Sequence, residues 1–157
     1  MANNGKKSEE AVRVILKGYQ EKFPAFFTRL YDSTTAKGGY VPPQVADFLG
    51  VYDGLALAIE VKSSEKHLSM LKVPKGYIRS SQIVGGRIFI RAGGKGLFIF
   101  HSLTGDVWEV WDSQDVIAWV LHGEKLTEGA RLLKVKGKKN LEVKLSEKLQ
   151  WLKSKNT

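Results

Sequence analysis

The stretch LALAIEVKSS, Leu55 to Ser64, constrains the fold more than any other part of the chain. Side chains alternate across a β-strand with a period of two, so the odd-numbered positions form a continuous aliphatic face. The other face presents two alanines, then Glu60 and Lys62. Burial of either charge is unfavourable unless the two serve each other or a ligand. The pattern predicts a strand that packs on one face and holds two charges, open to close approach, on the other.

A further carboxylate precedes this strand. Residues 45–54, VADFLGVYDG, predict another strand, and the two strands meet at Asp53-Gly54, a dipeptide favoured in tight hairpin turns. Asp47 lies between Ala46 and Phe48, in an apolar setting. If the strands pair, Asp47 and Glu60 converge at one end of the hairpin, with Lys62 beside them. Asp53 is an alternative ligand to Asp47, but an aspartate before glycine in a tight turn already has a local structural reason.

The remaining chain predicts an α/β domain with a central mixed β-sheet flanked by helices. Helical spacing and caps predict helices at 8–23 and 113–123, the second capped by Ser113, with one or two turns at 77–84 ended by Gly85-Gly86. Alternating β-branched and aromatic residues predict strands at 25–33, 87–92, 96–102 and 106–112, with a hairpin turn at 91–96. Residues 34–44 predict a loop. In the tail, 132–137 and 141–145 suit strands, and 146–154 suits a helix.

Length and composition indicate one domain over residues 1–157, with a core of about 5–125 and a basic C-terminal extension of about 126–157. The chain lacks cysteine, begins with a polar segment, and has no apolar run of the roughly 18 residues that span a membrane. We therefore expect a cytoplasmic protein without a membrane partner. Disulfides and thiol chemistry are excluded.

Most of the formal charge of +9 lies at the C-terminal end. Residues 131–157 contain nine basic and two acidic residues. Such a segment attracts a phosphate backbone by counterion release. A solvated lysine-rich tail that aids solubility is the alternative, and charge alone does not separate the two.

Two carboxylates and a lysine held together suit metal-dependent phosphodiester cleavage. Carboxylates are hard oxygen ligands for Mg²⁺, which neutralises charge on a phosphate and acidifies bound water. The lysine orients that water or stabilises the transition state as a point charge. Glu-x-Lys also arises by chance in strands, so a structural ion pair remains an alternative.

At these residues the sequence resembles the PD-(D/E)xK nuclease superfamily, and within it the archaeal-type Holliday junction resolvases. The likeness rests on Asp47 followed by IEVKSS, on the start GKKSEEAVRVIL with Glu9, and on TRLYDSTT with Arg29. It covers roughly residues 5–92. It implies a restriction-endonuclease-like core and a Mg²⁺-dependent endonuclease, with Mn²⁺ as a substitute, that resolves four-way DNA junctions in recombination and repair.

The resemblance also implies roles for single residues. The metal ligands would be Asp47, Glu60 and the carbonyl of Val61, assisted by Glu9, and Lys62 would position the attacking water. Expected DNA contacts are Arg29, Ser33, Thr34, Lys6, Lys7 and Ser63. Members act as symmetric homodimers, and the aromatic segment 107–121 is a candidate dimer surface. A nuclease of this core for flaps, single strands or restriction sites, and a non-catalytic basic DNA-binding module, remain alternatives.

Overall fold

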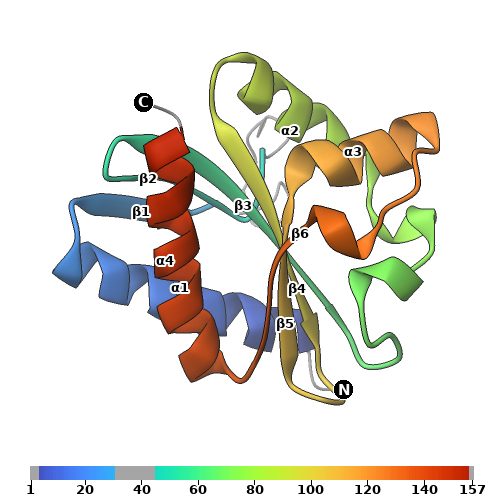
Figure 1. The fold of residues 1–157 in the computed structure, drawn as a ribbon, viewed down its shortest axis with the longest axis horizontal. Coiled ribbons are helices and arrows are strands. Elements are labelled where there is room, and N and C mark those ends of the chain that lie inside the picture. Colours follow the sequence, from blue (N-terminus) through green and yellow to red (C-terminus); the bar gives the residue numbers. More distant parts are fainter. Residues whose placement is uncertain (1–3, 31–44, 156–157) are drawn as a thin grey trace, which may run out of the picture.

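A six-stranded mixed sheet forms the centre of the computed structural model, which describes residues 4–30 and 45–155 (Figure 1). The strands follow one another across the sheet in chain order: β1 (Ala25–Arg29), β2 (Phe48–Tyr52), β3 (Leu55–Ser64), β4 (Lys95–Ser102), β5 (Val107–Asp112) and β6 (Arg131–Lys136). β3 and β4 are parallel, whereas the other neighbouring pairs are antiparallel. The predicted α/β class with a central mixed sheet is confirmed.

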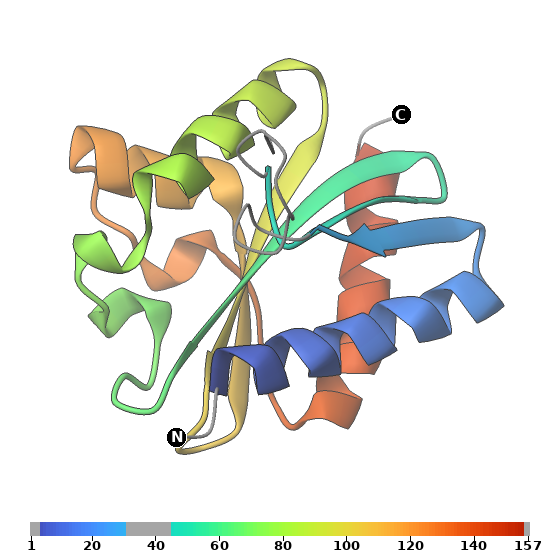
Figure 2. The same cartoon turned by 180° about the vertical axis from the view of Figure 1, so that it is seen from behind.

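Helices cover both faces of this sheet (Figure 2). One core holds buried side chains of α1 (Asn4–Lys22) and α4 (Lys138–Lys155), and the other holds those of α2 (Ser80–Arg91) and α3 (Ser113–His122). On β3 the odd positions Leu57, Ile59 and Val61 face the α1 side, as the alternation predicts. Short 3-10 turns occur at Met70–Lys72, Lys75–Tyr77 and Glu128–Ala130. None of the helices in the described ranges has the length and apolar character needed to cross a membrane.

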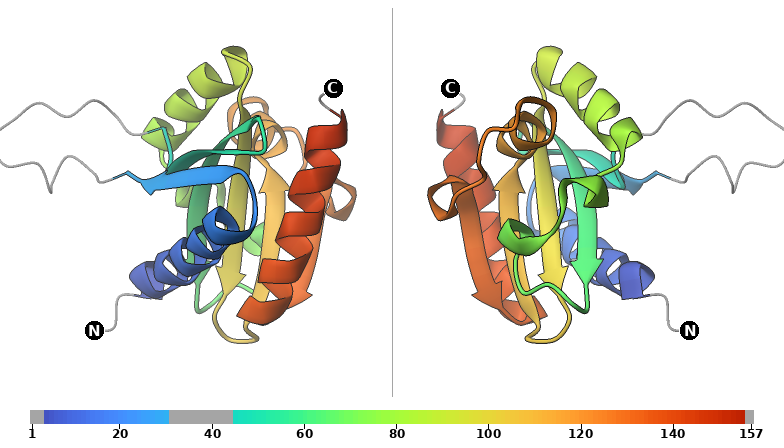
Figure 3. Two further views of the ribbon diagram at one scale, coloured as in Figure 1. Left: turned by 90° about the vertical axis from the view of Figure 1, so that its left-hand side faces the viewer. Right: turned by 90° about the vertical axis from the view of Figure 1, so that its right-hand side faces the viewer.

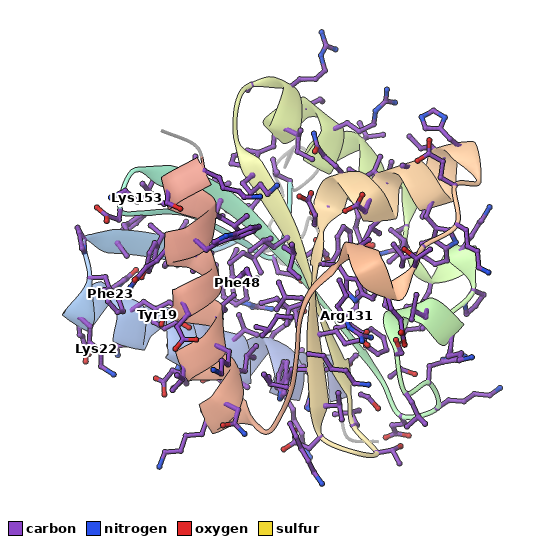
Figure 4. All side chains as sticks on the ribbon, viewed as in Figure 1. Tyr19, Lys22, Phe23, Phe48, Arg131 and Lys153 are labelled. Carbon is purple, nitrogen blue, oxygen red and sulfur yellow. The ribbon has the colours of Figure 1, made fainter. Side chains whose placement is uncertain are left out.

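The basic C-terminal segment is built into the fold. β6 pairs with β5 at the sheet edge, and α4 buries four leucines in the same core as α1 (Leu141, Leu145, Leu149 and Leu152). The predicted strand at 141–145 is wrong, because these leucines follow the helical spacing of one buried stripe. Tyr19 donates a hydrogen bond of 2.5 Å to the carbonyl of Glu142, and Figure 4 shows Tyr19 beside α4.

The structure corrects the prediction for residues 77–96. α2 continues through Gly85 and Gly86 to Arg91, so the predicted strand at 87–92 is wrong, and residues 92–94 connect α2 to β4 in place of the predicted hairpin turn at 91–96. Gly86 faces α3: a Cβ there would lie 3.5 Å from a methyl carbon of Ile117, an ordinary van der Waals contact. Gly86 therefore lies at a contact between two helices, and the glycine pair does not end α2.

The aromatic segment 107–121 lies mainly in the core. Trp108 and Trp111 are fully buried, on opposite faces of β5, so they cannot form the predicted dimer surface. α3 begins as predicted, but its cap is Asp112, whose side chain accepts a hydrogen bond from the backbone N–H of Gln114. Gly123 ends the helix in the left-handed conformation, as expected.

A fully buried carboxylate, Glu109, joins the segment after β3 to β5 and β6. It accepts hydrogen bonds from the hydroxyl of Ser69 (2.7 Å), the N–H of Met70 (2.8 Å), the indole of Trp111 (3.1 Å) and the guanidinium of Arg131 (2.8 Å). Buried charges of this kind are tolerated only when their lone pairs are satisfied.

Replacement of Arg131 with methionine should therefore destabilise the protein strongly. The change leaves the Glu109 charge buried without its cation, a loss of about 3–5 kcal/mol in the free energy of unfolding. Lys153→Met is the matched control, because Lys153 forms a more exposed ion pair with Asp53 (Figure 4) and such pairs contribute about 0–1 kcal/mol. Urea denaturation of both variants measures the difference, and equal losses would contradict the assigned role of Arg131.

Candidate active site

The register of the β2–β3 hairpin brings Asp47 to Glu60. Phe48 pairs with Ile59, so the next position outward along the same register sets Asp47 opposite Glu60. The carboxylate of Asp47 accepts a hydrogen bond of 2.8 Å from the backbone N–H of Val61, and its own carbonyl accepts one from Leu30 at the end of β1. Asp47 is therefore held at the point where β1, β2 and β3 meet.

The carboxyl group of Glu60 is buried beside that of Asp47. Burial, and next the negative charge of Asp47, raise the pKa of Glu60 to about 9, while Lys62 opposes the shift. A cation bound here would relieve the repulsion between the two carboxylates, so the pair suits a positively charged ligand.

Lys62 projects from the same face of β3 as Glu60. Burial lowers the pKa of the Lys62 ammonium, and the carboxylates of Glu60 and Asp47 oppose that effect. The ring of Tyr77 lies 5.8 Å from its nitrogen. The lysine is therefore a partly desolvated cation placed against the acidic pair.

Glu9 approaches the pair from the first turns of α1. It forms an ion pair with Arg29 of β1. Burial and the nearby charge of Asp47 raise the pKa of Glu9, and Arg29 lowers it. The predicted residues thus gather in one region: Glu9 comes from α1, Arg29 from β1, Asp47 from the position just before β2, and Glu60 and Lys62 from β3.

A buried hydrogen-bond chain fixes the start of α1. The hydroxyl of Ser8 lies 2.8 Å from Nδ1 of His101, and Nε2 of His101 lies 2.8 Å from the carboxylate of Asp106. The imidazole also stacks on the indole of Trp108, with 3.6 Å between ring centroids. This resembles a serine–histidine–aspartate arrangement, but Ser8 is buried, so the chain holds the helix that carries Glu9 and offers no accessible nucleophile.

Gln82 of α2 is part of the site and was missed from the sequence. Its side-chain carbonyl accepts a hydrogen bond of 3.0 Å from the N–H of Arg79, which orients its amide nitrogen toward Glu60 at 2.5 Å. Gln82 lies within the helical turns predicted at 77–84, but nothing in that stretch of sequence indicates its contact with Glu60. Gln82 fixes the orientation of the Glu60 carboxyl group.

The remaining residues were predicted to contact DNA, and the structure describes three of the five. Lys6 and Lys7 are exposed at the start of α1, and the carbonyl of Ser63 accepts a hydrogen bond from the hydroxyl of Tyr77. Ser33 and Thr34 lie outside the described residues. Their roles stay predictions.

The acidic pair fits a divalent cation. Asp47 and Glu60 present adjacent hard oxygen donors, the type that Mg²⁺ prefers. In the two described ranges, no group of three or more acidic or histidine side chains is arranged to hold a metal ion. Further ligands would have to be backbone oxygens or water, and Mg²⁺ commonly retains several waters.

Comparisons with known proteins support the fold. No family model matches the chain, and a search of curated proteins found no match. Among solved structures, the chain is similar to Hjc from Archaeoglobus fulgidus, a Holliday junction resolvase from an archaeal hyperthermophile. The TM-score is 0.50 at 17% sequence identity, and the alignment covers 84% of this chain and 88% of the other. At this identity the likeness establishes a resolvase-like fold and leaves the activity open.

Proposed function

We propose that this chain is a metal-dependent endonuclease of the PD-(D/E)xK superfamily that cuts branched DNA, most specifically four-way junctions. The observation that carries the proposal is the convergence of Asp47 and Glu60 at the end of the hairpin, with Lys62 on the same face of β3. The likeness to an archaeal resolvase fold supports it. A role in DNA recombination and repair follows from this substrate.

Each residue has a task in the proposed reaction. Bound Mg²⁺ would neutralise charge on the scissile phosphate and acidify a water molecule. Asp47 and Glu60 would hold the ion together with the carbonyl of Val61, and Gln82 keeps Glu60 in position. Lys62 Nζ would donate a hydrogen bond to the attacking water or to a phosphate oxygen.

Glu9 and Arg29 border this centre and would complete it. Glu9 is near enough to Asp47 for the two charges to interact, so we assign it an assisting role at the metal. Arg29, partly exposed beside it, suits a phosphate oxygen of the bound strand.

Cleavage of defined substrates tests the proposal. The protein is incubated with a labelled four-way junction, a flap and a linear duplex, each with Mg²⁺, Mn²⁺ or EDTA. Paired symmetric nicks confined to the junction, lost in EDTA, are expected. Equal cutting of linear duplex would favour another nuclease of this core, and binding without cutting would favour a non-catalytic module.

Thermal unfolding with and without metal gives a readout independent of cleavage. A cation that binds only the folded protein raises the melting temperature as its concentration exceeds the dissociation constant. We expect Mg²⁺ to raise the melting temperature of the wild type but not of an Asp47→Asn, Glu60→Gln double variant. An equal rise in both proteins would contradict metal binding by these carboxylates.

We further propose that the active form is a homodimer, since two matched cuts across a four-way junction suit a two-fold assembly. The outer face of α2, close to the site, supports this: Val84 and Ile88 lie one turn apart and are 55% and 63% exposed. A second copy that presents the same stripe would bury both residues, as a two-fold contact requires.

Ile88→Glu should therefore weaken the dimer by at least about tenfold, because a buried carboxylate at the centre of an apolar contact is unfavourable. Val143→Glu is the matched control, since Val143 is 53% exposed on α4, away from α2. Light scattering after size exclusion measures the mass. A monomeric wild type, or equal effects of the two substitutions, would contradict the proposed contact.

A further inference from the structure

Two adjoining hollows lie between α1 and the edge strand β1. The first has a volume of about 490 Å³ and is lined by Lys6, Glu9, Glu10, Arg13 and Arg29. The second, of about 290 Å³, shares Arg13 and Arg29 with the first and continues past Lys17 to Gln20. Figure 2 shows α1 and β1 running side by side at this edge of the molecule. The two hollows form one groove, which we call the α1–β1 groove.

One end of the α1–β1 groove opens at the candidate active site. Glu9 lines that end, and Arg29 lines both hollows; the next residue, Leu30, donates a backbone hydrogen bond of 2.8 Å to the carbonyl of Asp47, so the acidic pair is close to the groove mouth. At the other end, the side chain of Gln20 accepts a hydrogen bond of 2.5 Å from the backbone N–H of Phe27, which ties α1 to the edge strand. A strand cut at Asp47 and Glu60 therefore has a continuous path into the groove.

The charged residues that line the groove are mostly cations, and the rest of its lining is apolar or neutral. Lys6, Arg13, Lys17 and Arg29 face two carboxylates. Both carboxylates are engaged by arginine: Glu9 by Arg29, and Glu10 by Arg13 through two bonds of 2.9 and 2.6 Å. The Glu10 pair is exposed, and exposed pairs contribute little, so Arg13 exchanges Glu10 for a phosphate at small cost.

The spacing of these cations suits a nucleic-acid backbone. Positions 6 to 17 of α1 span about 16 Å at 1.5 Å per residue. One strand of duplex DNA presents about five phosphates over that length. Arginine also binds phosphate oxygens through two parallel N–H donors.

We infer that the α1–β1 groove binds the phosphate backbone of the DNA arm that leaves the cutting site, through Arg13 and Lys17. This inference rests on the proposed nuclease function and adds the path of the substrate. It assigns substrate binding to α1 and β1 and not to the more basic C-terminal segment, whose helix α4 packs against β6 and α1 (Figure 3).

The test compares two double variants that remove the same charge. Binding of a labelled four-way junction is measured by fluorescence anisotropy in EDTA over a range of KCl concentrations. For Arg13→Gln with Lys17→Gln we expect a dissociation constant at least tenfold higher. The plot of log affinity against log salt concentration should also be shallower by about 1.8, because each of the two lost phosphate contacts contributes about 0.9 to the slope. The control, Lys144→Gln with Lys155→Gln on α4, should change the dissociation constant less than threefold.

A substitution of opposite sign sharpens the test. Glu10→Gln removes a negative charge from the groove, so binding should tighten two- to fivefold, whereas Glu147→Gln on α4 should have no such effect. Equal effects of the groove and α4 variants would overturn the inference. The nuclease proposal would still stand if the wild type bound and cut the junction. A wild type that binds no DNA at any salt concentration would overturn both.

Discussion

Asp47→Asn is expected to lower the rate of junction cleavage by about 10³-fold while DNA binding is retained. The substitution removes one of two negative charges that would hold the metal, and a loss of about 4 kcal/mol in transition-state stabilisation corresponds to that factor. Asparagine retains a side-chain oxygen that can accept the hydrogen bond from the N–H of Val61, so the hairpin should stay folded. Single-turnover cleavage in Mg²⁺, binding in EDTA and thermal unfolding measure the three quantities.

Asp53→Asn is the matched control on the same hairpin. Asp53 has a φ of 46° in the β2–β3 turn, a conformation that asparagine adopts readily. Its carboxylate pairs with Lys153 of α4, away from the acidic pair. Cleavage by this variant should stay within about threefold of wild type. A similar loss in both variants would mean that Asp47 acts through the general stability of the hairpin and not at the reacting phosphate.

Strand periodicity and turn chemistry were enough to predict the centre of the site. The alternation from Leu55 to Ser64 assigned Glu60 and Lys62 to one face, and the Asp53-Gly54 turn set the register that carries Asp47 to Glu60. These are local effects, because a two-residue turn fixes which residues face each other across a hairpin. The pairing of Asp47 with Glu60 is therefore the part of the site that the sequence determines most directly.

Other parts depend on contacts between distant segments. The role of Gln82 could not be predicted, because its hydrogen bond to Glu60 joins α2 to β3 across 22 positions of the chain. The α1–β1 groove could not be predicted either, because its cations are interspersed with Glu9, Glu10 and apolar residues along 6–29. The C-terminal segment is conspicuous in the sequence for its many lysines, but its structural role depends on its buried leucines, which complete the core.

Lys62→Met is expected to lower the single-turnover rate by about 10²- to 10³-fold with little change in DNA affinity. Removal of a positioned hydrogen-bond donor that stabilises developing charge typically costs that much. Because burial already lowers the pKa of the Lys62 ammonium, an apolar side chain of similar length should be accommodated without loss of stability. Lys66→Met, four residues further on and exposed, is the matched control and should leave the rate unchanged.

The same substitution separates a catalytic lysine from a structural one. If Lys62 only neutralises Glu60 within the sheet, its removal leaves a buried acidic pair without its cation. The melting temperature should then fall clearly in EDTA and recover when Mg²⁺ replaces the lost charge. If Lys62 positions the attacking water, the melting temperature stays near that of the wild type and the cleavage rate falls even at saturating Mg²⁺ and DNA. Loss of stability with a normal rate in Mg²⁺ would exclude the catalytic role.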